Sequence, residues 1–469
     1  MNNQADIEND TIAAIASGLG GGVGVIRLSG PFALPIAKKL CFVENMGSFD
    51  IEPRKATYVS FFSNTKKLID KGLILYFPNP HSFTGEDVVE IHGHGSRFLL
   101  QEVLDELFYF GARLARPGEF CERAFLNNKI DLIQAEAMAD LIESQNKTAA
   151  FSAVKSLSGE FSKEINHLDS LIVDLRVLVE AEIDFPDEEI NIKIKEEVLK
   201  KLPLINNKIA NILNVARQGL ILKDGVNVAI LGKPNVGKSS LLNNFSKDEV
   251  AIVSSVAGTT RDLLKKDIIL GSLPINIIDT AGLRDTVDEI ENEGIKRAAN
   301  ASKNVNLILM VQDVNDSEAI RETSKTGFEK LISLLKKYSI ELKSKVIIVN
   351  NKIDMLDIKP DHVVGDDFSI FNVSVKKNTG LEVLKQHIEE LFLSDLGEGV
   401  FSARERHINC LKNCLNHLST AKNNFLNQDA MELVAEDLRL AQNALGDITG
   451  QVTSDDILGE IFSTFCIGK

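Results

Sequence analysis

The sequence has no apolar run that approaches the roughly 18 residues of a membrane-spanning helix. Its first residues, MNNQADIEND, are polar, so we expect neither a signal peptide nor membrane association, and a cytoplasmic location. The chain has only five cysteines and no CxxC pair, which favours reduced thiols over a disulfide framework. Positive charge is also scarce, because 52 lysines and arginines face 67 acidic residues, a net charge of −15. This balance argues against a protein held on nucleic acid mainly by its overall field.

The chain does contain a succession of distinct patterns, and at 469 residues it is too long for one hydrophobic core. Residues 1–119 hold short apolar or alternating runs between glycine and proline turns, as expected of a small α+β domain. Apolar spacing of three or four residues predicts helices in 120–219 and again in 393–469. Between them, 220–392 alternates strands with helical sequence, which predicts a parallel sheet covered on both faces. We therefore expect a multidomain protein in which an α/β domain is inserted into a discontinuous all-α helical domain.

The stretch GKPNVGKSS (232–240) satisfies the pattern G-x-x-x-x-G-K-[ST] and follows the apolar run VNVAIL. Gly232 and Gly237 let the backbone curl so that its N–H groups face a phosphate. Lys238 supplies a charge to the outer phosphates, and Ser239 supplies a hydroxyl for Mg²⁺. A simple glycine-rich turn is the alternative, but it does not require the preceding strand. The nucleotide contacts that we predict in this loop are Asn235, Val236, Gly237, Lys238, Ser239 and Ser240.

Two later strand ends carry residues that predict GTP. Asp279 in DTAG follows one strand, where a carboxylate can hold the magnesium shell, and Gly282 can offer its N–H to a γ-phosphate. In NKID, the carboxylate of Asp354 matches the two adjacent donors of guanine, which adenine lacks. NKID by itself is compatible with an ordinary polar turn, but the order of the motifs favours a GTP site. The contacts predicted here are Asp279, Thr280, Ala281, Gly282, Asn351, Lys352, Asp354, Ser374, Val375 and Lys376.

The segment IVSSVAGTTRD (252–262) lies between these motifs and predicts a switch. Thr260 is placed to give Mg²⁺ a second hydroxyl when the segment orders around a γ-phosphate. Leu283 stands after the DTAG glycine, where many GTP-hydrolysing switches have a glutamine that holds the attacking water. Leucine cannot hold a water molecule, so another group must take that role. The contacts predicted in the segment are Ser254, Ser255, Val256, Ala257, Gly258, Thr259 and Thr260.

Taken together, GKPNVGKSS, AGTTRD, DTAGLRDTVDEIE and NKID resemble the MnmE family of tRNA-modification GTPases. GEDVVEIHGHG, GEFCERAFLNNKIDLIQAEAMADLI and the final FCIGK resemble it as well, so the resemblance covers the whole chain. It implies a Ras-like P-loop G domain inserted into the helical domain, and a folate-binding N-terminal domain that dimerises. The implied function is GTP hydrolysis in the modification of the tRNA wobble uridine, U34. The product would carry a 5-carboxymethylaminomethyl or 5-aminomethyl group.

The resemblance further implies potassium-dependent hydrolysis, activated when the G domains of a homodimer pair. The bound K⁺ would neutralise negative charge that grows on the phosphates in the transition state. Glu291, the last residue of DTVDEIE, would orient the attacking water, although the sequence alone is also compatible with a solvated acidic helix face. The residues that match the family's potassium ligands are Asn235, Ser254, Val256 and Thr259.

The resemblance also implies a one-carbon donor, a tetrahydrofolate derivative in the 5,10-methylene or 5-formyl form. The matching positions are Arg27, Glu90, Lys129 and Lys469, each of which alone would be taken for a surface charge. A buried Glu can accept hydrogen bonds from the pterin, while Arg and Lys meet the acidic tail. Cys466 would lie near the folate and be needed for modification, although a terminal cysteine is more often a buried small hydrophobe. The implied partner is the flavoprotein MnmG, which would carry FAD in a heterotetramer-type complex.

Two alternatives remain open at this stage. A regulatory GTPase that acts by binding, for example in ribosome or RNP assembly, accounts equally well for 220–392. It leaves FCIGK and the amino-terminal domain without a role. An ATP-using P-loop enzyme is disfavoured by NKID.

Overall fold

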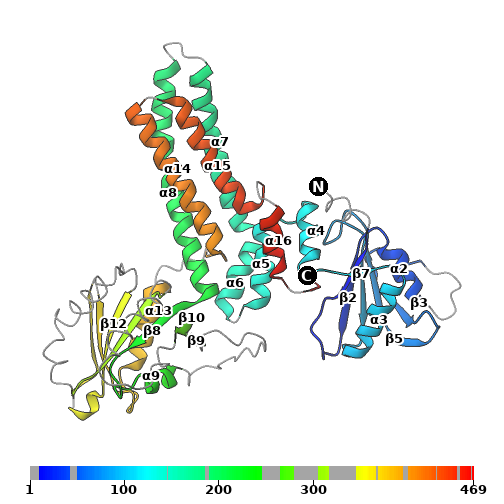
Figure 1. Ribbon diagram of the computed structural model, residues 1–469, viewed down its shortest axis with the longest axis horizontal. Coiled ribbons are helices and arrows are strands. Elements are labelled where there is room, and N and C mark those ends of the chain that lie inside the picture. The colour runs from blue at the N-terminus through cyan, green and yellow to red at the C-terminus, as the bar shows by residue number, and fades with distance from the viewer. Residues whose placement is uncertain are drawn as a thin grey trace. The chain divides into compact units, whose positions relative to one another are not determined.

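The computed structural model forms two compact units (Figure 1). One unit contains Met1–Glu143, Ala153–Ile212 and Asn409–Lys469, and the other contains Ser144–Ser152 and Leu213–Ile408. Within the described part of the chain, no helix is both long and apolar enough to cross a membrane. The described residues are 10–42, 50–144, 146–184, 190–245, 265–278, 305–315, 345–356, 358–365, 368–393, 400–428, 430–451, 455–465 and 467–468.

The amino-terminal part of the first unit is an α+β domain, as the sequence predicts. Its seven-stranded sheet has the order β3-β4-β5-β6-β2-β1-β7 and is antiparallel except where β1 pairs with β7. The apolar residues of two helices recur every three or four positions, so each helix packs one face into the core shared with the sheet. The elements are β1 (Ile12–Ile15), β2 (Gly24–Ser29), α2 (Ala33–Leu40), β3 (Cys41–Phe42), β4 (Thr57–Phe62), β5 (Leu68–Phe77), β6 (Val88–Gly93), α3 (Arg97–Tyr109) and β7 (Arg113–Leu114).

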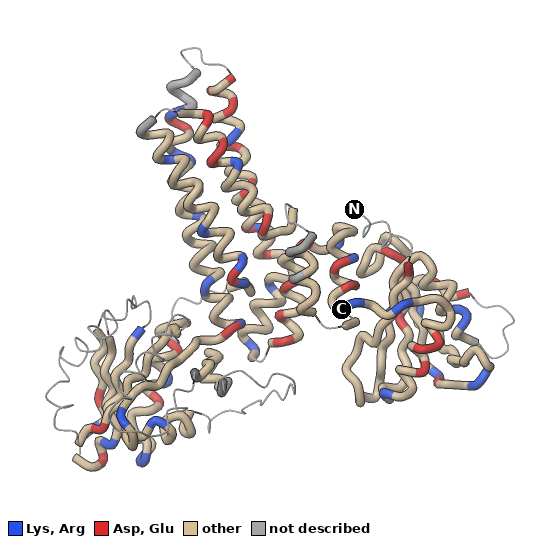
Figure 2. Tube along the Cα trace, in the orientation of Figure 1, with Lys and Arg blue, Asp and Glu red and all other residues tan. Residues whose placement is uncertain are grey.

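The helical domain is built from two separate chain segments, which confirms the predicted discontinuity. Its longest helices lie side by side in Figure 1, and α7 packs against α15. Along the described parts of these helices, Figure 2 shows acidic and basic residues interspersed. The helices are α4 (Glu119–Leu126), α5 (Leu132–Glu143), α6 (Lys147–Leu157), α7 (Glu160–Asp184), α8 (Ile190–Asp224), α14 (Glu405–Gln428), α15 (Met431–Thr449) and α16 (Asp455–Ser463).

The second unit contains the inserted α/β domain, whose sheet has the order β13-β14-β12-β11-β8-β10-β9. Five strands are parallel, namely β8, β10, β11, β12 and β14. The carboxyl ends of these five strands therefore meet at one edge of the sheet. The elements are β8 (Val226–Leu231), α9 (Lys238–Phe245), β9 (Lys265–Leu270), β10 (Leu273–Ile278), β11 (Leu307–Asp313), β12 (Lys345–Asn351), the 3₁₀ turn η2 (Ile353–Met355), β13 (Asp361–Val364), β14 (Phe368–Asn372) and α13 (Leu381–Leu393).

The predicted parallel sheet is present in these five strands, and the structure adds an antiparallel strand at each edge, β9 and β13. The connections explain the difference. Only Gly271 and Ser272 separate β9 from β10, and a parallel pair needs a crossover of a dozen or more residues. Gly271 has a φ of 62°, which suits this tight turn.

Candidate functional site

The loop between β8 and α9 requires glycine at two positions. Gly232 has a φ of 149°, and a Cβ there would lie 2.1 Å from the carbonyl oxygen of Val311. Gly237 has a φ of 104°, and a Cβ there would lie 2.2 Å from Nδ2 of Asn351. A larger residue at Gly232 would collide with the backbone of β11, and one at Gly237 would displace the side chain of Asn351. The predicted phosphate loop is thus a tightly enclosed turn between a strand and a helix.

Lys238 begins α9 and folds back along this loop. Its Nζ donates to the carbonyl oxygens of Gly232 at 2.6 Å and Lys233 at 2.8 Å. Burial lowers the pKa of Lys238. The ammonium is thus held within the loop by two carbonyl oxygens, and the loop leads into the amino terminus of α9, where the backbone favours phosphate. Ser239 follows in the first turn of the helix and is exposed.

Asn351, at the end of β12, joins the phosphate loop to the loop that follows β14. Its Nδ2 donates to the carbonyl oxygen of Val236 at 2.8 Å, and its Oδ1 accepts from the backbone N–H of Val375 at 3.1 Å. Asn351 is only 3% exposed, so these partners replace water. One buried carboxamide thus fixes the separation between two loops that the sequence predicts to hold opposite ends of a nucleotide.

The carboxylate of Asp354 is oriented by Ser374. The Ser374 hydroxyl donates to Oδ1 of Asp354 at 2.6 Å and accepts from the backbone N–H of Lys377 at 3.1 Å. The pKa of Asp354 is lowered, chiefly by the Ser374 hydrogen bond and also by the charges of Lys377 and Lys376. The predicted guanine-binding carboxylate is therefore ionised at neutral pH and fixed from the neighbouring loop.

The structure brings together the predicted nucleotide contacts of 235–240, 351–354 and 374–376 at the carboxyl edge of the sheet. β10, which leads to Asp279, ends at Ile278 in register with Ala229 of β8. The other predicted nucleotide and ion residues lie outside the described residues. These are Ser254, Ser255, Val256, Ala257, Gly258, Thr259, Thr260, Asp279, Thr280, Ala281, Gly282 and Glu291.

A second candidate site lies in the amino-terminal domain, where Arg27 and Glu90 face each other across β2 and β6. Arg27 Nε and Nη2 donate to Oε1 of Glu90 at 3.0 and 2.9 Å. Oε2 of Glu90 lies 3.3 Å from Nε2 of His92. The resemblance implies separate contacts of the arginine and the glutamate with a folate, whereas in the structure the two side chains are paired with each other.

Two aromatic rings that the sequence argument did not single out flank Arg27. Its guanidinium carbon lies 5.3 Å from the ring centre of Phe83 and 5.8 Å from that of Phe120. Lys129 approaches the same loop, because a Cβ at Gly85 would lie 2.9 Å from Lys129 Cε. Phe83 and Phe120 come from distant segments of the chain, so sequence spacing gave no signal for either ring.

The end of the chain reaches the same part of the domain. Ile467 forms a β-bridge with Pro117, and a Cβ at Gly468 would lie 2.2 Å from the carbonyl oxygen of Ile15. Ala14, which precedes Ile15 in β1, is opposite Arg27. Cys466 and Lys469 themselves lie outside the described residues. The tail residues adjoining them nevertheless lie next to the strand that pairs with β2.

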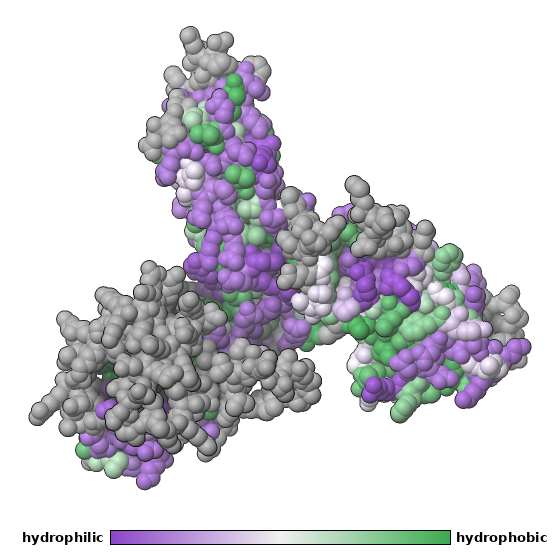
Figure 3. Space-filling view, viewed as in Figure 1, coloured by the Kyte–Doolittle hydropathy of each residue, from purple (hydrophilic) through white to green (hydrophobic). Residues whose placement is uncertain are grey.

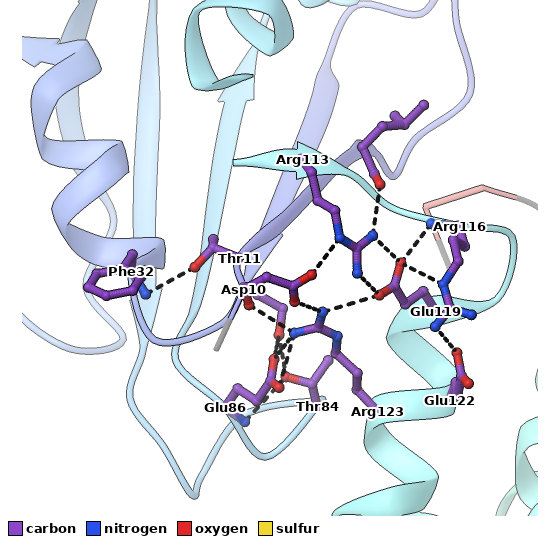
Figure 4. A network of polar contacts seen from close by, with 12 residues as sticks. Asp10, Thr11, Phe32, Thr84, Glu86, Arg113, Arg116, Glu119, Glu122 and Arg123 are labelled. Carbon is purple, nitrogen blue, oxygen red and sulfur yellow. Dashed lines mark hydrogen bonds and ion pairs between the residues drawn. The ribbon is translucent and has the colours of Figure 1, made fainter. Parts of the chain in front are cut away.

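A buried charge network holds α4 against this region (Figure 4). Arg123, 1% exposed, contacts the carboxylates of Asp10, Glu86 and Glu119. Burial opposes ionisation of Glu119, but hydrogen bonds from Arg113 and the Arg116 N–H, with the charge of Arg123, lower its pKa to about 2. Since α4 carries Phe120 and Glu86 follows the Phe83 loop, the network fixes both elements that flank Arg27.

The histidines of EIHGHG have separate carboxylate partners, His92 with Glu90 and His94 with Asp70. Within the described parts of the chain, no group of three or more His, Cys, Asp and Glu residues is arranged to hold a metal ion.

Comparison with known proteins gives matches along most of the chain. Residues 11–129 match the family model described as GTP-binding protein TrmE N-terminus, and residues 132–466 match the MnmE helical domain. A tRNA modification GTPase MnmE of Legionella pneumophila (Philadelphia 1) is 46% identical over 98% of this chain and 99% of its own length. A protein of the same description from Coxiella burnetii (RSA 493) is 46% identical, again over 98% and 99%. A solved GTP-binding protein from Sulfolobus solfataricus, in complex with GDP, is 16% identical to this chain. The alignment covers 63% of this chain and 76% of that protein, with a TM-score of 0.26.

Proposed function

Because the chain belongs to the MnmE family of tRNA modification GTPases, we propose that it hydrolyses GTP to drive modification of the tRNA wobble uridine, U34. The modified base would carry a 5-carboxymethylaminomethyl or 5-aminomethyl group. The observation that carries the GTPase part is the Asn351 bridge between the Val236 and Val375 loops. That bridge sets the distance between a phosphate loop and a guanine-selective carboxylate.

In the proposed GTP site, Lys238 meets the outer phosphates and the backbone N–H groups of 235–240 surround them. Ser239 and Thr260 would hold Mg²⁺, which would supply positive charge to the phosphates. Ser239 fits this role because its hydroxyl is exposed in the first turn of α9. Asp354 would accept from the two guanine donors, and its ionised state suits that task.

We assign hydrolysis to K⁺ and Glu291, with Asn235, Ser254, Val256 and Thr259 as the potassium ligands. Asn235 fits, since it is exposed, has a φ of 64° and offers a carboxamide oxygen in the phosphate loop. The cation would supply the positive charge that other GTPases obtain from an arginine. Glu291 would orient the attacking water, because Leu283 cannot.

The cluster around Arg27 is our candidate folate site, with Glu90, Lys129, Lys469 and Cys466. A folate has a flat pterin and an anionic glutamate tail. The half-buried ring of Phe83 is suited to a flat group, whereas Phe120 is fully buried and only packs against Arg27. The charges of Arg27 and Lys129 are suited to an anionic group. The tail at Ile467 and Gly468 lies beside β1, which supports a position for Cys466 near this cluster.

The proposed partners are a second copy of the chain, the flavoprotein MnmG with FAD, and tRNA. The amino-terminal domain has exposed apolar side chains that include Leu19, Val23, Leu68 and Leu73, and Figure 3 shows apolar surface on this domain. Exposed apolar patches are typical of interaction surfaces. The net charge of −15 fits a division in which the partner provides most of the RNA-binding surface. The proposed location is the cytoplasm.

Reconstitution tests the proposal. The chain is combined with GTP, Mg²⁺, K⁺, a methylene-tetrahydrofolate, MnmG with its FAD, unmodified tRNA and, as the nitrogen donor, ammonium or glycine in parallel mixtures, and the nucleosides are then analysed. Modified uridine is expected only in the complete mixture, and substitution of Cys466 by Ser should abolish it without removing GTP hydrolysis. GTP hydrolysis with unmodified uridine in the complete mixture would favour a regulatory switch instead.

A further inference from the structure

Asp313, at the end of β11, holds the ammonium group of Lys352. Oδ2 of Asp313 lies 2.6 Å from Nζ of Lys352. Asp313 is opposite Asn351 in the parallel β11–β12 pair, so the lysine reaches sideways from the end of one strand to the end of the next. Neither the sequence pattern nor the GTP contacts proposed above include Asp313.

Asn315 fixes the carboxylate of Asp313. The backbone N–H and Nδ2 of Asn315 both donate to Oδ1 at 2.9 Å, while Oδ2 accepts from Lys352. Burial opposes ionisation, but the hydrogen bonds from Lys352 and Asn315 lower the pKa of Asp313. The partner of the lysine is therefore an oriented anion.

The segment 313–315 makes two further contacts with the loop 351–355, which carries Lys352 and Asp354. The Val314 N–H donates to the carbonyl oxygen of Asn351 at 3.0 Å, and Asn315 Nδ2 lies 3.3 Å from Sδ of Met355. These contacts bracket Lys352 and Asp354 from both sides. The end of β11 is thus a support for the loop that carries the guanine-binding carboxylate.

The conformation of Lys352 suggests how the end of β11 could affect nucleotide binding. Its φ of 69° is unusual for a residue with a side chain, and its side chain is 33% exposed. An unrestrained lysine side chain loses rotamer entropy when a ligand packs against it. Because Asp313 already holds the ammonium, the methylene chain is restrained before any nucleotide binds.

We propose that Asp313 is a positioning residue for GTP, which holds the methylenes of Lys352 as a fixed apolar strip against the purine while Asp354 recognises its edge. The inference rests on the GTP site proposed above. It adds a residue from a third strand end to that site. Its effect is on the affinity for the base, so it should act equally on GDP and GTP.

The test is a double-mutant cycle on nucleotide affinity, with Asp313→Ala, Lys352→Ala and the double variant of the full chain. Dissociation constants for GDP, GTP and ITP, which lacks the 2-amino group, are measured by calorimetry. We expect Asp313→Ala to raise the constants for GDP and GTP by about fivefold, with the ITP-to-GTP ratio and kcat unchanged. The double variant should bind no more weakly than Lys352→Ala. Glu382→Ala, which removes an exposed ion pair on α13, is the matched control and should bind as the wild type does.

The inference would be overturned if Asp313→Ala bound GDP and GTP as tightly as the wild type does. It would also be overturned if the fold-losses in affinity of the two single variants multiplied in the double variant, because the two residues would then act independently. If Asp313→Ala does not fold, Asp313→Asn is used in its place. The amide keeps the shape of the aspartate side chain but removes the negative charge that faces the ammonium of Lys352. The same criteria then apply. A wild-type chain that binds ATP as tightly as GTP would instead overturn the GTP site itself.

Discussion

The hydroxyl of Ser374 donates a 2.6 Å hydrogen bond to the carboxylate of Asp354, although the two residues lie on loops after different strands. The same hydroxyl accepts from the Lys377 N–H, so its donor direction is determined by the protein. A carboxylate held in this way does not have to be ordered when a nucleotide binds. Selectivity for guanine in the proposed site therefore depends on a pair rather than on one acid.

Replacing Ser374 with Ala is expected to weaken guanine nucleotide binding by roughly tenfold, the scale of a hydrogen bond to a charged group. It should also change the pH dependence. Ser374 lowers the pKa of Asp354, so without it the carboxylate protonates at a higher pH and GTP binding is lost at a higher pH on acidification. Binding isotherms from pH 7 downward measure both effects. If the wild type and Ser374→Ala lost GTP binding at the same acidic pH, the proposed effect of Ser374 on Asp354 would be contradicted.

Asn351→Ala should uncouple the phosphate loop, at Val236, from the loop that follows β14, at Val375. The carbonyl oxygen of Val236 would lose its buried partner, at a cost of about 1–3 kcal/mol in unfolding free energy, and nucleotide affinity should fall as well. Asn350→Ala is a matched control, because Asn350 is also buried but bonds to Gln312 and Asn372. Urea unfolding should show both variants destabilised, and only Asn351→Ala should weaken GTP binding. Equal affinities in the two variants would contradict the role of Asn351.

Glu119 should make a pH-dependent contribution to stability. Its pKa in the folded chain is about 2, below its ordinary value, so its contribution is fully present above that ordinary value and is lost as the pH falls toward 2. The depression corresponds to about 3 kcal/mol. Glu119→Gln should lower the unfolding free energy at pH 7 and show a smaller loss between pH 4.5 and pH 2 than the wild type.

Glu122→Gln, in the same helix, is the control for that measurement. Burial raises the pKa of Glu122, so its ionised form is disfavoured in the folded chain. Its replacement by a neutral residue should therefore not lower stability at pH 7. Equal destabilisation by the two substitutions would show that helix packing, rather than charge pairing with Arg113 and Arg123, accounts for the effect.

Gly468→Ala should separate tRNA modification from GTP hydrolysis. Gly468 has a φ of 97°, and a Cβ there would meet the Ile15 carbonyl oxygen, so the tail must move away from β1. We expect the reconstituted modification rate to fall at least tenfold, while the GTPase rate stays within twofold of the wild type. Gly459→Ala, in α16, has open space around its Cβ and should leave both rates unchanged. Full modification by Gly468→Ala would exclude a role for the tail position.

Several features follow from the sequence because their physical causes are local. The phosphate loop needs glycines between a strand and a helix, and NKID follows an apolar strand, so spacing along the chain is sufficient to predict both. Helical periodicity on both sides of the α/β segment likewise predicts the inserted domain.

Other features depend on contacts between residues far apart in the chain, and only the tertiary structure decided them. Arg27 and Glu90 are 63 positions apart, and the register of β2 with β6 makes them an ion pair. Asp313 reaches Lys352 because β11 and β12 are parallel neighbours, a pairing that no local spacing encodes. The sequence by itself thus determined which chemical groups the chain carries and on which elements. The packing of those elements determined which groups neutralise, orient or restrain one another, because electrostatic and hydrogen-bonding energies depend on distances in space.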